Sequence, residues 1–362
     1  MARHRKNLTI DEHSAPSILE VKPDKVPARN LWVDYAKAIG IILVVFGHVE
    51  RGVFQADLKI NQSMYELADS VIYSFHMPLF FFLSGLFLLA SMAKRDSNSL
   101  FRSKIDSILY PYVVWSLLQG LIEVALSQYV NGHPTMEAVL SFAWSPRAQF
   151  WFLYVLFFTF ALSIFVYRRS SHIWCTGVFI GSISFYFLGR LLPDVYLINA
   201  LSHNFVYFAA GVFASFLLAK SSVIKTTWLV LAAALFIISQ WTFHIALGLR
   251  YGSNTASANL LLALISISCV VFLALWLARF NLRWLAYLGQ NSMTIFLLHI
   301  LAGSGCRIVL QNIFGITDVG VHLLIGTLGG LLLPLLFYIY CERLGLGILF
   351  HPPKFLSFGN QH

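Results

Sequence analysis

Residues 31–50 read LWVDYAKAIGIILVVFGHVE, an almost continuous apolar stretch of twenty residues. The hydrocarbon core of a bilayer is about 30 Å thick, and a helix needs about twenty apolar residues to cross it. This stretch therefore predicts a transmembrane helix. Similar apolar runs follow it to about residue 341, so the whole chain is of the same kind.

The composition of the chain also indicates a membrane protein. Apolar residues make up 58% of the 362 residues and charged residues only 11%, whereas a soluble domain carries about 25% charged residues. So little charge excludes an ordinary cytosolic enzyme and a disordered chain. Because the apolar runs are continuous, whereas barrel strands alternate, the spans are expected to be helices. The predicted fold class is an all-α, polytopic membrane helical bundle.

About ten transmembrane helices are expected, and together they form one domain over residues 31–341. A polar tail, residues 1–30, precedes this domain, and a second tail, residues 342–362, follows it. The expected spans lie near residues 31–50, 69–92, 105–128, 148–167, 172–189, 196–219, 226–247, 257–279, 285–307 and 318–341.

The segments that connect these spans are alternately rich and poor in basic residues. Cytoplasmic segments of membrane proteins are enriched in Lys and Arg. With the N-terminus in the cytoplasm, the inner segments hold 18 basic residues and the outer loops hold 6. This bias predicts that both ends of the chain are cytoplasmic. The six residues assigned to outer loops are Arg51, Lys59, Arg147, Arg190, Arg250 and Arg307.

The excess of Lys and Arg in cytoplasmic segments explains the net charge of +9. This charge therefore does not indicate nucleic-acid binding, and none is expected. The four cysteines stand alone in or beside apolar segments, without the spacing of metal ligands. Neither a disulfide framework nor a metal site is therefore expected. The cysteines are Cys175, Cys269, Cys306 and Cys341.

Ionisable side chains inside the spans are the first candidates for function, because such a group costs several kcal/mol in lipid unless it is paired or hydrated. Lys37 and His48 lie eleven positions apart in the first span, which is about 16 Å along a helix and nearly one face. Lys37 then lies toward the cytoplasm and His48 toward the outer end. A snorkelling lysine with an interfacial histidine is the plain alternative.

Three further residues fall in the outer halves of their spans. His76 precedes Pro78, which is expected to kink the second span. Trp151 begins the fourth span, and His299 lies about two-thirds of the way outward along the ninth. Together with His48, these residues predict an outward-facing polar pocket. The alternatives are a core histidine bonded to a backbone carbonyl and an aromatic belt at the membrane interface.

A basic cluster lies on the inner side, before the third span. Four cations at the start of a transmembrane helix can bind either anionic membrane lipid or a phosphate-rich ligand, and the lipid is the simpler interpretation. The cluster consists of Lys94, Arg95, Arg102 and Lys104.

Five motifs, in this order, resemble the signature of the membrane-bound acyltransferase-3 family. The resemblance covers about residues 30 to 341 and is greatest to stand-alone O-acetyltransferases of bacterial surface polysaccharides and exopolysaccharides. Lys37 stands where the family usually has Arg, and Ser107 stands where many members have a second Arg before the proline. The motifs are Lys37 to His48, His-x-Pro-x-Phe-Phe-Phe-x-Ser-Gly from His76 to Gly85, the basic stretch before Pro111, Phe150 to Leu153, and Asn291 to His299.

The resemblance implies an integral-membrane O-acyltransferase in the bacterial cytoplasmic (inner) membrane. The donor it implies is a cytoplasmic acyl-CoA, usually acetyl-CoA. The acceptor it implies is a sugar hydroxyl of a polysaccharide or a lipid-linked oligosaccharide. Membrane lipid surrounds the enzyme, and polysaccharide-assembly proteins are further candidate partners.

The resemblance also suggests roles for the candidate residues. His48 is the expected general base, since an imidazole titrates near neutral pH, and Lys37 and His76 complete the expected catalytic set. A covalent acyl-histidine and direct transfer both remain open. The expected substrate-binding residues are Asp34, Ser84, Trp151, Asn291 and His299. The expected donor-binding residues are Lys94, Arg95, Arg102 and Lys104.

Two other functions fit the composition. A transporter or polysaccharide exporter also places His and Lys inside its spans, but the chain shows no inverted repeat of the kind common in transporters. A structural membrane protein of a polysaccharide assembly complex would use the same polar residues for helix packing.

Overall fold

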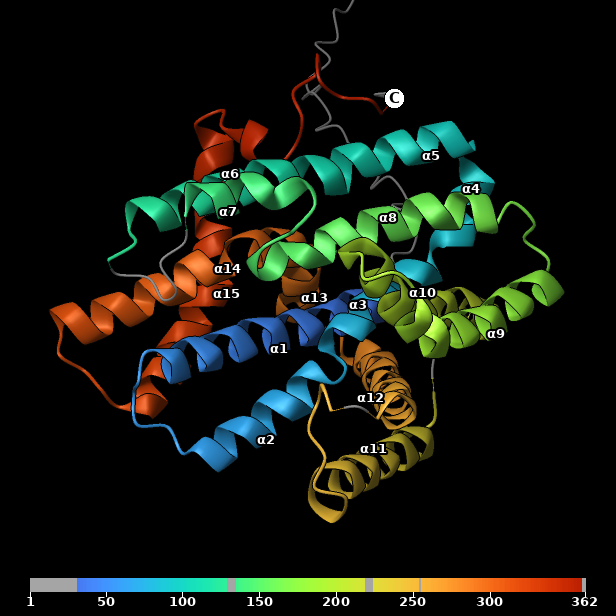
Figure 1. Cartoon of the computed structure of the whole chain (residues 1–362), viewed down its shortest axis with the longest axis horizontal. Coiled ribbons are helices and arrows are strands. Elements are labelled where there is room, and N and C mark those ends of the chain that lie inside the picture. The colour runs from blue at the N-terminus through green and yellow to red at the C-terminus, as the bar shows by residue number, and fades with distance from the viewer. Residues whose placement is uncertain (1–30, 129–134, 219–223, 254, 360–362) are drawn as a thin grey trace, which may run out of the picture. The chain divides into compact units, whose positions relative to one another are not determined.

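The computed structural model describes residues 31–128, 135–218, 224–253 and 255–359, apart from the side chain of Arg190. The predicted polar tail, residues 1–30, lies outside these ranges. Helices make up the regular structure of the described residues, and no strand occurs among them (Figure 1). This confirms the predicted all-α membrane bundle.

Fifteen α-helices are found in the described ranges. They are α1 (Leu31–Gln55), α2 (Gln62–Tyr73), α3 (His76–Leu86), α4 (Leu88–Lys94), α5 (Ser97–Lys104), α6 (Tyr110–Ala125), α7 (Met136–Leu140), α8 (Trp151–Val166), α9 (His172–Leu188), α10 (Tyr196–Leu218), α11 (Thr226–Trp241), α12 (Ala256–Leu277), α13 (Arg283–Gln290), α14 (Ser292–Ile308) and α15 (Val319–Arg343).

Nine helical stretches of the described residues are long and apolar enough to cross a membrane. The fifth predicted span corresponds to α9, which has 17 residues and is therefore shorter than these nine. The nine stretches are Leu31–Gln55, Gln62–Lys94, Ser97–Ala125, Met136–Val166, Tyr196–Leu218, Thr226–Ala246, Ala256–Phe280, Ser292–Ile313 and Val319–Arg343.

Helix α1 is the central element of the bundle (Figure 1). It packs against α2, α3, α12, α13, α14 and α15. Its side chains Tyr35, Ile41 and Val44 are completely buried, as expected of a helix that is apolar on every face. Polar groups on α1 consequently face protein rather than lipid.

The kink predicted at Pro78 is a complete break, and it lies earlier in the chain. Helix α2 ends at Tyr73 and α3 begins at His76, so Pro78 falls in the first turn of the new helix. A proline costs little there, because the first turn of a helix has no carbonyl to receive its N–H. The break places the His76 side chain at the start of α3, beside the end of α2.

Helices α3 and α10 approach until their backbones touch. A Cβ atom at Gly85 of α3 would lie 2.0 Å from the Phe208 carbonyl oxygen, and one at Gly211 of α10 would lie 2.0 Å from the Phe82 carbonyl oxygen. Small residues at such crossings let membrane helices pack without a hydrophobic driving force. The two glycines therefore fix how close α3 can come to α10.

We expect Gly85→Ala and Gly211→Ala to destabilise the protein by about 1–3 kcal/mol, the usual cost of overpacking a core. The measurement is the melting temperature of the purified protein in detergent. Gly181→Ala is the matched control, because a Cβ atom there meets nothing within 4 Å and alanine favours a helix. Unchanged melting temperatures for the Gly85 and Gly211 variants would contradict the backbone contact.

Candidate functional site

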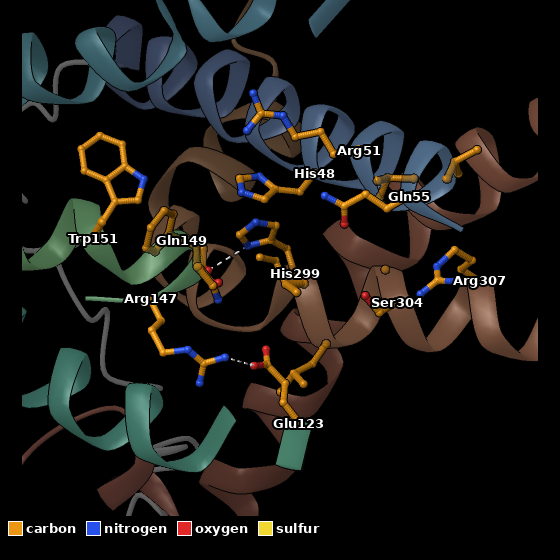
Figure 2. Close-up of a pocket in the computed structure, with 18 of the residues that line it drawn as sticks. His48, Arg51, Gln55, Glu123, Arg147, Gln149, Trp151, His299, Ser304 and Arg307 are labelled. Carbon is orange, nitrogen blue, oxygen red and sulfur yellow. Dashed lines mark hydrogen bonds and ion pairs between the residues drawn. The ribbon is translucent and has the colours of Figure 1, made fainter. Parts of the chain in front are cut away.

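A cavity of about 700 Å³ opens at the C-terminal end of α1 (Figure 2). Its walls come from the last two turns of α1, the junction of α2 and α3, the end of α6, the segment before α8 and the C-terminal half of α14. Four residues predicted from the sequence line it: His48, His76, Trp151 and His299. The structure thus brings together side chains from four separate spans.

Two imidazole rings face each other inside this cavity. The rings of His48 from α1 and His299 from α14 have centroids 4.9 Å apart and are nearly perpendicular, at 78° (Figure 2). The Tyr73 ring lies 6.0 Å from the His48 ring and 4.5 Å from the His76 ring. A continuous group of titratable rings therefore spans α1, the α2–α3 junction and α14.

Each imidazole is held by a carbonyl oxygen about one helical turn before it. His48 Nδ1 donates to the Val44 carbonyl oxygen over 2.9 Å, and His76 Nδ1 donates to that of Ile72 over 2.7 Å. His299 Nδ1 donates to the Phe296 carbonyl oxygen over 2.8 Å.

These three hydrogen bonds fix the proton on each ring. A carbonyl oxygen can only accept, so Nδ1 carries the hydrogen and Nε2 of the neutral ring keeps a lone pair. Nε2 of His76 and of His299 is buried and has no hydrogen-bond partner among the described residues. His48 is only partly buried and lines the open cavity. Its Nε2 is therefore suited to accept a proton from a bound molecule.

Two ion pairs frame the histidines. Arg51 makes two hydrogen bonds with the Asp69 carboxylate, at 2.5 and 3.0 Å, and its guanidinium lies 3.2 Å above the centre of the Tyr73 ring. Arg147 pairs with Glu123 at 3.2 Å. The pairs fix the positions of Tyr73 and of the segment leading to Trp151.

The chain matches the sequence profile of an acyltransferase domain over residues 30–339, which is most of its length. It belongs to the acyltransferase-3 family. Family membership agrees with the resemblance of the five motifs.

Two curated relatives are both described as nodulation protein NolL. The protein of Sinorhizobium fredii is 24% identical over 238 residues, which cover 64% of this chain and 60% of the relative. The protein of Mesorhizobium japonicum is 26% identical over 135 residues, which cover 37% and 35% of the two chains. The chain therefore aligns with less than two-thirds of these relatives. No solved structure matches the chain.

Three other predicted residues lie outside the cavity lining. Asp34 is buried and accepts a hydrogen bond from Gln290 over 3.2 Å, where α13 packs on α1. Asn291 donates to the Tyr287 carbonyl oxygen and joins α13 to α14. Ser84 lies on α3, eight residues beyond His76. Among the described residues, no three His, Cys, Asp or Glu side chains are grouped as metal ligands.

The predicted basic cluster lies on α4, on α5 and at the junction between them, and Lys37 of α1 interacts with it. Lys104 interacts electrostatically with Arg95 and with Lys37 of α1, and its ammonium lies 4.0 Å above the Phe160 ring. Lys94 and Arg102 are exposed beside them. The chain therefore gathers several positive charges at a second place, outside the cavity.

The arginines that line the cavity were not predicted from the sequence as site residues. Arg51, which was counted with an outer loop, lies on α1, because that helix continues to Gln55. Arg307, the last residue of the predicted ninth span, lies on α14. Helix α1 extends beyond its predicted span, residues 31–50, so hydropathy ends it too early. One signal was available: Arg51 follows His48 by three residues, which places both on one helix face.

Proposed function

We propose that this chain is an integral-membrane O-acyltransferase that moves an acyl group, most simply acetyl, from cytoplasmic acyl-CoA to a hydroxyl of a cell-surface or exopolysaccharide sugar. It would work in the bacterial inner membrane. One observation carries the proposal: inside an acyltransferase domain, the His48 ring stands in the cavity with Nδ1 bonded to a carbonyl. That arrangement presents a lone pair at Nε2 to an incoming hydroxyl.

The proposed reaction is direct transfer. The acceptor hydroxyl oxygen attacks the thioester carbonyl carbon while its proton passes to Nε2 of His48. The tetrahedral intermediate then collapses, the carbon–sulfur bond breaks, and the proton on His48 passes to the departing CoA sulfur. A base of this kind contributes about 10²–10⁴-fold to such a reaction.

The negative oxygen of the intermediate needs a hydrogen-bond donor. The neutral rings of His76 and His299 offer lone pairs at Nε2, so they would orient hydroxyl groups rather than stabilise the oxyanion. Tyr73 is the better donor. Its hydroxyl is buried without a hydrogen-bond partner among the described residues, and its ring touches the His76 ring. We assign the oxyanion contact to Tyr73.

The donor would be held at the other end of α1. Lys37, Arg95 and Lys104 form the cationic group there, and a CoA carries several phosphates. Lysine binds phosphate as a point charge, without the fork of arginine. The pantetheine arm would then follow α1 from Lys37 to His48, about 16 Å.

The acceptor class follows from the cavity and from the family resemblance together. Trp151 offers an aromatic face at one side of the imidazoles, and sugar rings stack on such faces. The polar chain from Gln149 through Gln119 to Glu123 supplies buried hydrogen-bonding groups beside it. A polyhydroxylated acceptor fits these surroundings.

His48→Ala is the direct test of the proposed function. We expect transfer of labelled acetyl from acetyl-CoA to the glycan to fall at least a hundredfold, since the general base is lost. The assay uses membranes with matched abundance of each variant. His351→Ala is the control, because His351 is exposed and does not line the cavity. Undiminished transfer by His48→Ala would remove the mechanism.

Tyr73→Phe tests the oxyanion contact. Removing one such donor lowers kcat by about 10²–10³-fold in known enzymes, and we expect a loss of that order with little change in the KM for acetyl-CoA. Tyr340→Phe is the matched control, because Tyr340 is exposed and lies outside the cavity lining. If kcat stays the same in Tyr73→Phe, the oxyanion donor is another group.

Lys104→Ala tests the donor site. A hydrogen bond to a charged group is worth about 1.5–3 kcal/mol, so we expect the KM for acetyl-CoA to rise about tenfold or more with kcat nearly unchanged. The KM for S-acetylpantetheine, which lacks the nucleotide phosphates, should be the same in wild type and variant. Lys354→Ala, at an exposed lysine near the C-terminus, is the control. An equal effect on both donors would contradict phosphate binding at Lys104.

A further inference from the structure

Arg307 is a buried cation of the cavity that neither the ion pairs nor the proposed mechanism uses. It lies near the end of α14, only 8% exposed, and lines the cavity. Its Nε has no hydrogen-bond partner among the described residues. Figure 2 shows its guanidinium turned toward Ser304, away from the C-terminal end of α14.

The charges of the cavity do not balance at this position. Arg51 is neutralised by Asp69, and Arg147 by Glu123. Neither of these ion pairs includes Arg307. An arginine remains protonated in a protein, and an uncompensated buried charge is strongly destabilising. The cavity thus holds a positive charge that an anionic ligand can neutralise.

Arg307 lies on the same helix as His299, and both residues line the cavity. It follows His299 by eight residues, which is about 12 Å along α14. Side chains in a helix tilt toward its N-terminus, so the guanidinium reaches back toward the imidazole. In Figure 2 the rings of His48 and His299 lie between Trp151 and Arg307, and Gln55 and Ser304 lie at the Arg307 end.

We infer that Arg307 binds an anionic group on the acceptor, either the carboxylate of a sugar acid or the phosphate of a lipid-linked sugar. This inference rests on the proposed function, because it concerns the acceptor of that reaction. Arg307 is then a positioning residue: it holds the acceptor by a group other than the hydroxyl that meets His48. A neutral sugar would leave the guanidinium without a counterion, so the same contact selects acidic acceptors.

The test measures binding and needs no acyl transfer. The full-length protein is reconstituted in nanodiscs of zwitterionic lipid, and microscale thermophoresis gives the Kd of three disaccharide probes. Cellobiouronic acid carries a carboxylate where cellobiose has a hydroxymethyl group, and cellobiose 1-phosphate carries a phosphate. The variants are Arg307→Gln, Arg307→Lys and, as the control, Arg279→Gln at an exposed arginine outside the cavity lining.

We expect the wild type to bind at least one charged probe about ten- to a hundredfold more tightly than cellobiose, the range for a charge-assisted contact. Arg307→Gln should remove this preference without weakening the binding of cellobiose. Arg307→Lys should keep part of the preference, and Arg279→Gln should keep all of it. The charged probe that binds more tightly identifies the source of the anion.

Equal affinity of the wild type for all three probes would overturn the inference, as would a charge preference that survives in Arg307→Gln. Either result leaves the acyltransferase proposal intact, because that proposal is tested by acetyl transfer at His48. Conversely, a protein that prefers the charged probes but transfers no acetyl group would contradict only the proposed function.

Discussion

The chemistry of the cavity depends on one hydrogen bond that occurs three times, from an imidazole Nδ1 to a carbonyl oxygen about one helical turn before it. A carbonyl oxygen has two lone pairs, so it can receive this bond and its helical N–H together. The bond costs the helix little and fixes both the orientation and the tautomer of the ring. Without it, an imidazole could present either N–H or a lone pair to the cavity. With it, His48, His76 and His299 all present Nε2.

This constraint explains why a central α1 matters for the site. Helix α1 touches α2, α3 and α14, which carry Tyr73, His76 and His299. Because the rings of His48 and His299 are fixed to their own helices and that of His76 to a carbonyl of α2, the relation between the rings is set by helix packing. The break between α2 and α3 adds the necessary adjustment, since His76 Nδ1 bonds to the Ile72 carbonyl at the end of the preceding helix. Packing at Gly85 and Gly211 then holds α3 in place.

Much of the fold could be predicted, because the physical cause lies within single segments. A run of twenty apolar residues predicts a span whatever its neighbours are, and intramembrane histidines are expensive enough to indicate a site. His48, His76 and His299 could be predicted on this basis. The same cost does not single out Arg51 or Arg307, because an arginine near the end of an apolar run can extend its charge to water. The folded bundle places both beside the cavity. The proximity of Lys37 to Lys104 could not be predicted either, because no spacing along the chain relates α1 to α5.

The arrangement along α1 separates two kinds of charge. Near Lys37, the positive groups Arg95 and Lys104 interact electrostatically, and part of the cluster is exposed. At the His48 end two arginines are paired with carboxylates, and the imidazoles between them are neutral donors of a lone pair. The first end is therefore the more cationic one and suits the proposed acyl-CoA donor. Among the cations that line the cavity at the second end, Arg307 stands outside the two ion pairs. A general base works best when its pKa lies near the working pH, and a nearby charge of either sign shifts that pKa. The Asp69 carboxylate offsets the positive charge of Arg51 three residues from His48. The guanidinium also stacks on the Tyr73 ring and so supports the position of that ring.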